Sequence, residues 1–417
     1  MRRALSSLTT RGRTFLAAGV SVTLAGWLSS QGAVVPVGIL AVLLPLLSLL
    51  WVTRSAPDLE VTRTVSPPVV SVGQVAVVDL TVTNRARRST GLLLMEEALP
   101  YALGSRPRLV LPDTRSGASV TTRYSVRSDV RGRHPVGPLT VRLTDPFGMV
   151  DLPSRDASAS HVTVTPRIVP LSSLEAGGAW TGTGDNRPRS FAAGSAEDVT
   201  VREYRRGDDL RRVHWRSSAR VGELMVRREE QPWQSRATVY VDNRAGVHVG
   251  HGAGSTLEVA VQVAASVAAH LVRQGFSVRL VSATGERLGA EWHTLDASAG
   301  LTPLLEQLAV MGTTPLTLPE TRWLSEPGHG GLVVAVLGRV TEHDTHFLGR
   351  LGLRATDSLA LTLDTPGWAA GRGGPTTATV PPELRSAGWR AVVLGPGDDL
   401  DTRWRALARA AERGGVR

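Results

Sequence analysis

Several residue types are missing or scarce in this chain of 417 residues. It has no cysteine, which excludes disulfides and thiolate metal sites. It has no lysine and only two isoleucines, Ile39 and Ile168, so arginine alone supplies the side-chain positive charge. The net charge of +10 and the pI near 11.1 are typical of nucleic-acid-binding proteins. The same residue usage is expected from a very GC-rich genome, which weakens that inference.

Recognisable catalytic motifs are also missing. The chain has no Gly-x-Ser-x-Gly elbow, no His-Glu-x-x-His pair and no P-loop. The segment Thr181-Gly182-Thr183-Gly184 lacks the Gly-Lys-Ser/Thr ending that a phosphate-binding loop requires. We therefore expect no enzymatic activity, no cofactor and no small-molecule substrate.

An uncharged run extends from Thr14 to Thr53. One helical crossing of a bilayer needs about 20 residues, so the run is long enough for two crossings, joined at the turn-prone segment 29–32. Arginine excess marks the cytoplasmic side of a membrane. Arginines flank the run on both sides, at Arg2, Arg3, Arg11, Arg13, Arg54 and Arg63. We predict a transmembrane helical hairpin over residues 14–53 of a cell-membrane protein, with both termini cytoplasmic.

A cleaved signal peptide is the alternative interpretation of the same run, with an apolar core from Phe15 to Leu28. No Ala-x-Ala cleavage site follows Leu28, and a second apolar run from Ala33 to Val52 begins almost at once. These two features favour the hairpin.

Residues 57–166 alternate apolar and polar side chains with a period of two, which is typical of half-buried strands. Breakers such as Asp145-Pro146-Phe147-Gly148 separate the runs. We predict an antiparallel β-sandwich. The clearest strands are expected at 59–63, 75–82, 119–126 and 139–143.

Residues 237–417 alternate strands and helices instead, which predicts a mostly parallel sheet covered on both faces. Strands are expected at 237–242, 277–283, 331–337, 358–363 and 389–394, and helices at 255–274, 302–311 and 402–413. Ligands of such domains bind beyond the carboxyl ends of the strands. Asp242, Ala283, Gly338 and Gly395 should occupy that edge.

The segment between these regions, residues 167–236, begins with an irregular stretch, Gly177 to Arg189, that we interpret as an exposed connector. Its second half is dense in charge. Asp208 and Asp209 suit the start of a helix near Leu210, Gly222 should end it, and a strand should follow over 223–230. The residues that we single out as binding a partner or joining the domains are Arg202, Tyr204, Asp208, Asp209, Arg212, His214, Trp215, Arg216 and Arg220. Capping and packing alone would also account for each of them taken singly.

The same segment resembles the signature of the domain-of-unknown-function family number 58. The matching words are Arg202-Glu203-Tyr204, Gly207-Asp208-Asp209, Arg212, His214-Trp215, Ser218-Ala219-Arg220 and Leu224. The hairpin and the turns at Arg131-Gly132 and Asp145–Gly148 fit as well. The resemblance implies a multi-domain membrane-anchored protein whose C-terminal domain is α/β and similar to a von Willebrand factor type A domain. Proteins of this kind are commonly encoded beside a MoxR-type AAA+ ATPase. The resemblance therefore also implies this ATPase as a partner.

Type A domains often bind a divalent cation through Asp-x-Ser-x-Ser after the first strand. Here that position reads Asp242-Asn243-Arg244-Ala245-Gly246, so Arg244 and Gly246 replace the two hydroxyl ligands. Arginine has no lone pair to offer and brings a positive charge. We therefore expect no bound metal, with Asp242 a weak candidate ligand that instead bonds loop amides or pairs with Arg244.

These observations leave three functional hypotheses. The first is a non-enzymatic membrane scaffold that docks a cytosolic protein, an AAA+ ATPase by resemblance. The second is a nucleic-acid-binding protein that uses segment 202–228, although Asp208, Asp209, Glu229 and Glu230 reduce its charge and no nucleic acid is expected. The third is a metal-dependent hydrolase that uses Asp242 with Asp398 or Asp399.

Overall fold

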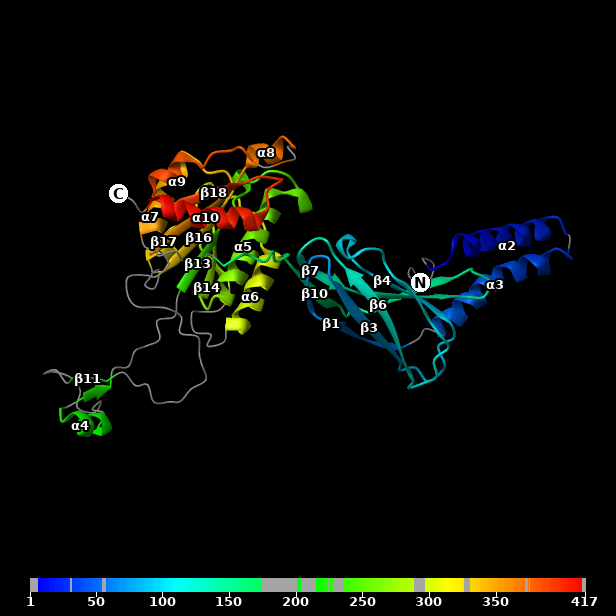
Figure 1. The fold of residues 1–417 in the computed structure, drawn as a ribbon. Helices are drawn as coiled ribbons and strands as arrows, with labels where there is room; N and C mark the ends of the chain where they lie inside the picture. The colour runs from blue at the N-terminus through cyan, green and yellow to red at the C-terminus, as the bar shows by residue number, and fades with distance from the viewer. Residues whose placement is uncertain are drawn as a thin grey trace. The chain divides into compact units, whose positions relative to one another are not determined.

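The computed structural model describes residues 7–30, 32–54, 58–173, 201–203, 215–223, 225–227, 236–288, 297–325, 331–353, 355–371, 374 and 376–414. The chain forms two compact units, Met1–Pro166 and Arg167–Arg417 (Figure 1). Each is described here by itself. The connector predicted at Gly177 to Arg189 lies outside the described residues.

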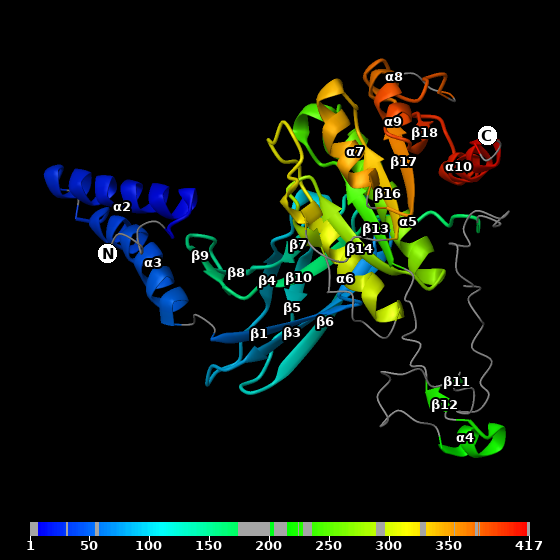
Figure 2. The same cartoon turned by 90° about the vertical axis from the view of Figure 1, so that its left-hand side faces the viewer.

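Two helices open the first unit, α2 (Thr10–Leu28) and α3 (Val35–Arg54). They lie side by side in both views (Figures 1 and 2). A side chain at Gly19 would collide with Val42, and one at Gly38 would collide with Thr23, so small residues allow the close approach. Among the described residues α3 is the one helix long and apolar enough to cross a membrane. Helix α2 is the more polar of the two, since Arg11 and Arg13 fall inside it and several Ser, Thr and Gly dilute its apolar run.

The rest of the first unit consists of strands in three sheets. One has the order β1-β3-β6, the second β2-β10-β7 and the third β5-β4-β8-β9. The strands are β1 (Leu59–Ser66), β2 (Val69–Ser71), β3 (Val75–Asn84), β4 (Leu93–Glu97), β5 (Arg108–Leu111), β6 (Ser119–Arg127), β7 (Gly132–Val136), β8 (Leu139–Thr144), β9 (Asp151–Arg155) and β10 (Ser160–Thr165). All pairings are antiparallel except β2 with β10, which run parallel, so the expectation of a purely antiparallel region was wrong at that pair.

The alternation seen in the sequence places one face of each strand in a core. In β3, for example, Ala76, Val78, Leu80 and Val82 are buried. One buried cluster includes Leu80, Met95 and Val141 and extends to Leu8 and Val52 at the helices. The helices and the strands therefore share apolar contacts.

A six-stranded sheet forms the centre of the second unit, in the order β15-β14-β13-β16-β17-β18. All its pairings are parallel except that of β15 with β14. The strands are β13 (Arg236–Val241), β14 (Ser277–Ser282), β15 (Arg287–Leu288), β16 (Leu332–Leu337), β17 (Asp357–Leu363) and β18 (Arg390–Leu394). The helices are α5 (Thr256–Arg273), α6 (Ala297–Val310), α7 (Thr345–Leu353), α8 (Thr365–Ala369), α9 (Pro382–Ser386) and α10 (Leu400–Gly414). The mixed α/β architecture expected here is confirmed.

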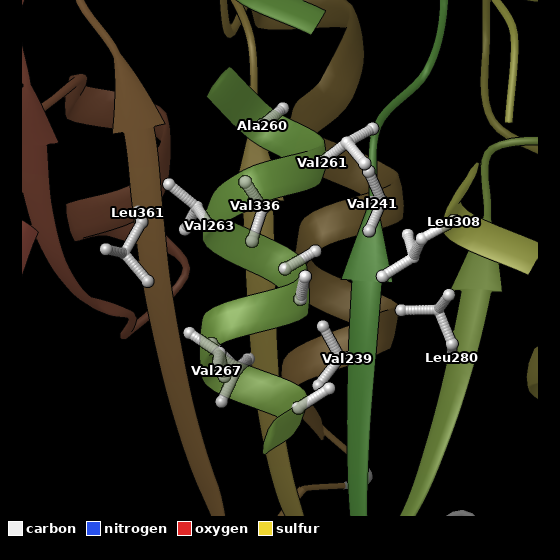
Figure 3. Packing of buried hydrophobic residues seen from close by; sticks show 14 of the residues in the cluster. Val239, Val241, Ala260, Val261, Val263, Val267, Leu280, Leu308, Val336 and Leu361 are labelled. Atoms are coloured by element: carbon white, nitrogen blue, oxygen red, sulfur yellow. The ribbon is translucent and has the colours of Figure 1, made fainter. Parts of the chain in front are cut away.

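Two buried clusters lie on opposite faces of this sheet. On one face Val239 and Val241 pack with α5, α6 and α10, and Figure 3 shows the α5 residues Ala260, Val263 and Val267 against the strands. On the other face Tyr240 packs with Trp323 and Phe347. Because successive strand residues point to opposite faces, β13 contributes to both clusters. Burial on both faces explains its continuous apolar sequence.

A small element of the second unit consists of β11 (Val201–Glu203), α4 (Trp215–Val221) and β12 (Met225–Arg227). Strands β11 and β12 pair antiparallel, and the Ser218 side chain accepts a hydrogen bond from the Met225 amide at 2.8 Å. Helix α4 ends at Val221 because Gly222 follows in the left-handed region, at φ 83°. The predicted helix start near Leu210 lies outside the described residues.

Candidate functional site

The carboxyl edge of the six-stranded sheet is the place where such folds bind ligands. From β13 the chain passes to β14 on one side and later returns to β16 on the other. The loops that follow β13 and β16 therefore diverge at a topological switch point. Asp242 directly follows β13, and the loop after β16 leads to Asp344.

Arg244 is buried between these two aspartates. Its Nε donates to Asp242 Oδ1 at 2.8 Å, and its Nη2 donates to Asp242 Oδ2 at 2.6 Å. Nη2 also lies 2.8 Å from Asp344 Oδ1, while Nη1 donates to the Thr317 carbonyl oxygen at 2.7 Å. A planar guanidinium suits this two-pronged contact with a carboxylate. We call Asp242, Arg244 and Asp344 the arginine clamp.

Local chain geometry holds each member of the clamp. The Arg244 backbone amide donates to Asp242 Oδ1 at 3.2 Å. Asp344 Oδ2 accepts from the amide and the hydroxyl of Thr341, both at 2.9 Å, as part of a capping box at the start of η6 (Glu342–Asp344). Clamp residues thus connect the loop after β13, the segment around Thr317 and the entry to α7.

Neighbouring polar groups fix the same loop. Asn243 donates to the Gly312 carbonyl at 2.8 Å and accepts from the Ala283 amide at 3.1 Å. His248 Nε2 lies 2.6 Å from the Asp242 carbonyl oxygen, and its Nδ1 lies 3.1 Å from Thr256 Oγ1. Gly338 packs so closely that an added side chain would collide with the Val247 carbonyl. The edge is therefore a rigid, hydrogen-bonded surface.

Burial and the neighbouring charges set the protonation states of Arg244 and His248. Burial alone would lower the pKa of Arg244, but the hydrogen bonds and charge of Asp242, together with Asp344, raise that pKa above its usual value. Burial lowers the pKa of His248, and the positive charge of Arg244 acts in the same direction. Arg244 therefore stays charged, whereas His248 favours its neutral form.

The clamp leaves little free space. The cavity beside it has a volume of about 10 Å³, which is about the space of one water molecule. Its lining includes Tyr240, Asp242, Arg244 and Asp344. The Tyr240 hydroxyl has no hydrogen-bond partner in the described part of the chain. A cavity of this size does not hold a substrate.

Asp242 pairs with Arg244 as the sequence suggested, and both of its carboxylate oxygens are engaged. In the described ranges no three acidic or histidine residues are grouped so that they could hold a metal ion. Asp344 was missed by sequence reasoning. Its signal was the spacing Thr341-x-x-Asp344 ahead of α7, which is a capping-box pattern.

The carboxylates of the hydrolase hypothesis are separated and differently engaged. Asp398 follows β18, three strands from β13 and so about 14 Å away at the usual strand spacing. It accepts from the Gly395 amide at 2.7 Å and pairs with Arg403 at 2.7 Å. Asp399 accepts from the amide and hydroxyl of Thr402, as helix-start residues do. Within the described ranges neither shares a hydrogen-bond partner with Asp242.

Four of the nine signature residues lie within described elements. Arg202 lies in β11 opposite Val226, and Trp215, Arg216 and Arg220 lie in α4. The Trp215 side chain is 70% exposed, and Arg220 is exposed in the last turn. The other signature residues lie outside the described residues: Tyr204, Asp208, Asp209, Arg212 and His214.

Comparison with solved structures gives only weak similarity. A Listeria innocua β-glucosidase in complex with gluconolactone is 15% identical at a TM-score of 0.18, over 26% of this chain and 16% of that one. A Pseudomonas fluorescens alkylpurine DNA glycosylase bound to DNA is 16% identical at 0.20, over 32% and 39%. A CARDB domain of a Pyrococcus furiosus protein in complex with di-metal ions is 18% identical at 0.20, over 26% and 93%. These TM-scores are too low to support any argument.

Sequence comparison is more specific. No curated protein matches the chain. Residues 200–291 match the family described as "Protein of unknown function DUF58". The matched range begins one residue before β11 and includes β11, α4, Asp242 and Arg244. Over residues 200–291 the chain therefore matches the DUF58 family, and this match supports the resemblance found in the sequence.

Proposed function

We propose that this protein is a non-enzymatic, membrane-anchored scaffold that docks a cytosolic protein on the carboxyl edge of its α/β domain. The arginine clamp is the observation that carries the proposal. At the edge where related folds bind small ligands, a buried guanidinium occupies the space and the adjacent cavity is about 10 Å³. Such a rigid, closed edge suits binding to a protein surface better than binding of a substrate.

Exposed side chains surround the clamp. Leu318 is exposed beside Thr317, whose carbonyl binds Arg244. Arg339 is exposed two residues after β16, and its Nη2 donates to the Gly246 carbonyl at 3.1 Å. His343 and His346 are exposed at the entry to α7. Arginine is among the residues enriched at protein interfaces, and here it lies on the same edge as an exposed leucine.

The C-terminal domain is, in this proposal, a von Willebrand factor type A-like domain. Support comes from the strand order, from the antiparallel edge strand β15 and from Asp242 at the end of the first strand. The family resemblance implies a MoxR-type AAA+ ATPase as the partner. Arg244 fills the position of a metal ligand, so docking would not need a divalent cation.

The membrane anchor is, in the same proposal, a two-helix hairpin with both termini cytoplasmic. Helix α3 is long and apolar enough to cross a bilayer. Helix α2 packs along it, and arginines lie at the ends away from the connecting turn. Trp27 and Trp51 are exposed near opposite ends of the helices, where aromatic residues favour the membrane–water interface.

A charge reversal on the proposed docking edge tests this function. The full chain with Arg339→Glu, purified from its own membrane, should carry at least about tenfold less ATPase, since a loss of 1.4 kcal/mol is tenfold in affinity. Arg385→Glu is the matched control, because Arg385 is exposed in α9, which precedes the opposite end of β18. Equal ATPase recovery from both variants would contradict docking at the clamp edge.

A further inference from the structure

The inference concerns the end of the first unit from which α2 and α3 extend. Helix α3 ends at Arg54, and β1 begins nearby at Leu59, which pairs with Asn84 at the end of β3. The turn 145–150 joins β8 to β9 at this same end, because the Thr9 amide donates to the Met149 carbonyl at 2.9 Å and Leu8 pairs with Val150. Both views place the helices beyond this end of the strands (Figures 1 and 2). We call it the helix-proximal end.

The turn 145–150 presents an aromatic side chain there. Asp145 is buried, and its carboxylate accepts from the Phe147 amide at 3.1 Å and from the Val150 amide at 2.7 Å. The turn is also fixed to the helix, since Thr9 Oγ1 donates to the Gly148 carbonyl at 2.7 Å. Phe147 remains 58% exposed on this rigid turn. A large apolar side chain is thus exposed at the end of the unit where α2 begins.

Arginines surround the same end. Arg11, Arg13 and Arg54 are exposed at the helix ends. The loop after β3 adds Arg87 and Arg88, both exposed, and Leu92, which is 76% exposed. This loop is held near the turn after β5, because Asn84 Nδ2 donates to the carbonyl oxygens of Arg88 and Thr114 at 2.7 and 2.9 Å.

Arg85 of the same loop pairs with Glu60, but three other arginines at this end are not paired in this way. In the described part of the chain neither Arg87 nor Arg88 has a carboxylate within ion-pair distance, and the same holds for Arg115 in the neighbouring turn. Asp113 is close by but accepts from the Gly91 amide at 2.9 Å. At the opposite end of β3 and β6, Arg127 lies 3.5 Å from Asp129.

We infer that the helix-proximal end binds the surface of an anionic phospholipid bilayer, with Phe147 and Leu92 inserted at headgroup depth and Arg87, Arg88 and Arg115 binding lipid phosphates. This rests on the proposed membrane anchoring. Juxtamembrane arginines attract anionic lipid, each by several-fold in affinity. The surface would fix the orientation of the strand region relative to the membrane, beyond what a flexible tether provides.

The absence of cysteine allows a direct depth measurement, because a single introduced cysteine can be labelled selectively. The full chain with Phe147→Cys, carrying an environment-sensitive fluorophore, is reconstituted into vesicles that contain shallow spin-labelled lipid. Quenching should be several-fold stronger than for a label at Tyr101→Cys, which is 99% exposed at the opposite end of β4. A label at Leu40→Cys in α3 tests the anchor itself. Quenching at position 40 without excess quenching at 147 would overturn the surface and leave the anchor standing. No quenching at 40 would overturn the anchor and the surface with it.

The lipid charge is tested in the same vesicles with spin-labelled phosphatidylglycerol against spin-labelled phosphatidylcholine. The label at 147 should be quenched several-fold more by the anionic lipid. The double change Arg87→Ala and Arg88→Ala should remove most of that preference, whereas Arg127→Ala should keep it. Equal quenching by the two lipids, or an equal loss with Arg127→Ala, would overturn the assignment to anionic headgroups.

Discussion

Each unit of the molecule contains a buried arginine between two carboxylates, and the two arginines differ in how many of their guanidinium nitrogens are bonded. In the first unit Arg63 Nε donates to Glu97 at 2.8 Å and Nη1 donates to Asp156 at 3.2 Å. Within the described residues Arg63 Nη2 and Glu97 Oε2 lack hydrogen-bond partners, and Asp156 is a quarter exposed. In the second unit all three guanidinium nitrogens of Arg244 have partners, and Asp242 and Asp344 are both buried. Asp344 Oδ1 lies 2.8 Å from Arg244 Nη2 but has no hydrogen-bond partner within the described residues.

The comparison teaches that a buried ion cluster does not by itself indicate a functional site. Ion-pair networks with a structural role also shift pKa values. The Arg63 centre joins β1, β4 and the segment after β9 inside the strand region, whereas the Arg244 centre occupies a topological switch point. Only the position of the second centre in its fold makes it a candidate site.

Removing each arginine should separate the two centres most strongly. Arg244→Ala would leave two buried carboxylates without their counterion, at a cost of about 3–5 kcal/mol in the free energy of unfolding. Arg63→Ala should cost less, about 1–3 kcal/mol, because Asp156 is partly hydrated and one guanidinium nitrogen of Arg63 already lacks a hydrogen-bond partner in the described part of the chain. Hydrogen-exchange mass spectrometry measures each unit separately, and Arg339→Ala is an exposed control on the clamp edge. Equal losses for the two arginines would show that completeness of the network does not set its strength.

The dependence of stability on pH should have opposite signs at Glu97 and Asp398. Burial raises the pKa of Glu97 in the folded state, so its contribution is fully present below the unfolded value near 4.5 and is lost as pH rises through the folded pKa. For Asp398 burial acts to raise the pKa, but hydrogen bonds from Arg403 and the Gly395 amide lower it overall. Its contribution is present above about 3.8 and is lost as pH falls through the folded pKa.

The variants Glu97→Gln and Asp398→Asn test those signs. In the wild type, protection of the first unit from amide exchange should decrease above pH 4.5, and Glu97→Gln should remove that decrease. Protection of the second unit should decrease on the acid side, and Asp398→Asn should remove that decrease. A shift of one pKa unit corresponds to about 1.4 kcal/mol. The measurement is amide exchange of each unit across a pH series, corrected for intrinsic exchange. The same direction of change in both variants would contradict the assigned causes.

The sequence predicted the strands and helices well where periodicity was strong. Strands β1, β3, β6 and β8 fall where alternation placed them, and Ser255 caps α5 as expected, accepting from the Glu258 amide at 3.4 Å. Short strands such as β2 and β9 were missed, because a strand of three to five residues contains too few alternations to recognise.

The candidate site was predicted only in part. Asp242 and Arg244 are two residues apart, so their pairing could be inferred from local chemistry. Asp344 is a hundred residues away, and its place beside Arg244 depends on strand order, which periodicity does not encode. The sequence also did not decide whether Trp215 is buried or exposed. In the structure its side chain is exposed.

A metal titration tests whether Arg244 prevents Asp242 from binding a divalent cation. The wild-type chain should show no saturable heat with micromolar Mg²⁺ or Mn²⁺, because both oxygens of Asp242 are engaged by Arg244. Arg244→Ser combined with Gly246→Ser would free Asp242 and restore two hydroxyl ligands, which suit a hard cation. Calorimetry of both proteins decides the question. Saturable micromolar heat in the wild type would show that other oxygens complete a site despite the clamp.

The smallest effect on stability is expected on α4, outside both arginine centres. Trp215 is 70% exposed and Arg220 is exposed, so replacing either by alanine should change the free energy of unfolding by no more than about 0.5 kcal/mol.

Arg216→Glu should likewise leave the melting temperature unchanged, because it lies in the same short helix. It should nevertheless reduce the ATPase that co-purifies from the native membrane, since an arginine of the signature suits an acidic groove on the partner. Glu223→Gln, an exposed change just after α4, is the matched control. Unchanged melting together with unchanged ATPase recovery for Arg216→Glu would mean that this residue of α4 makes no contact with the partner, and docking would then depend on the clamp edge alone.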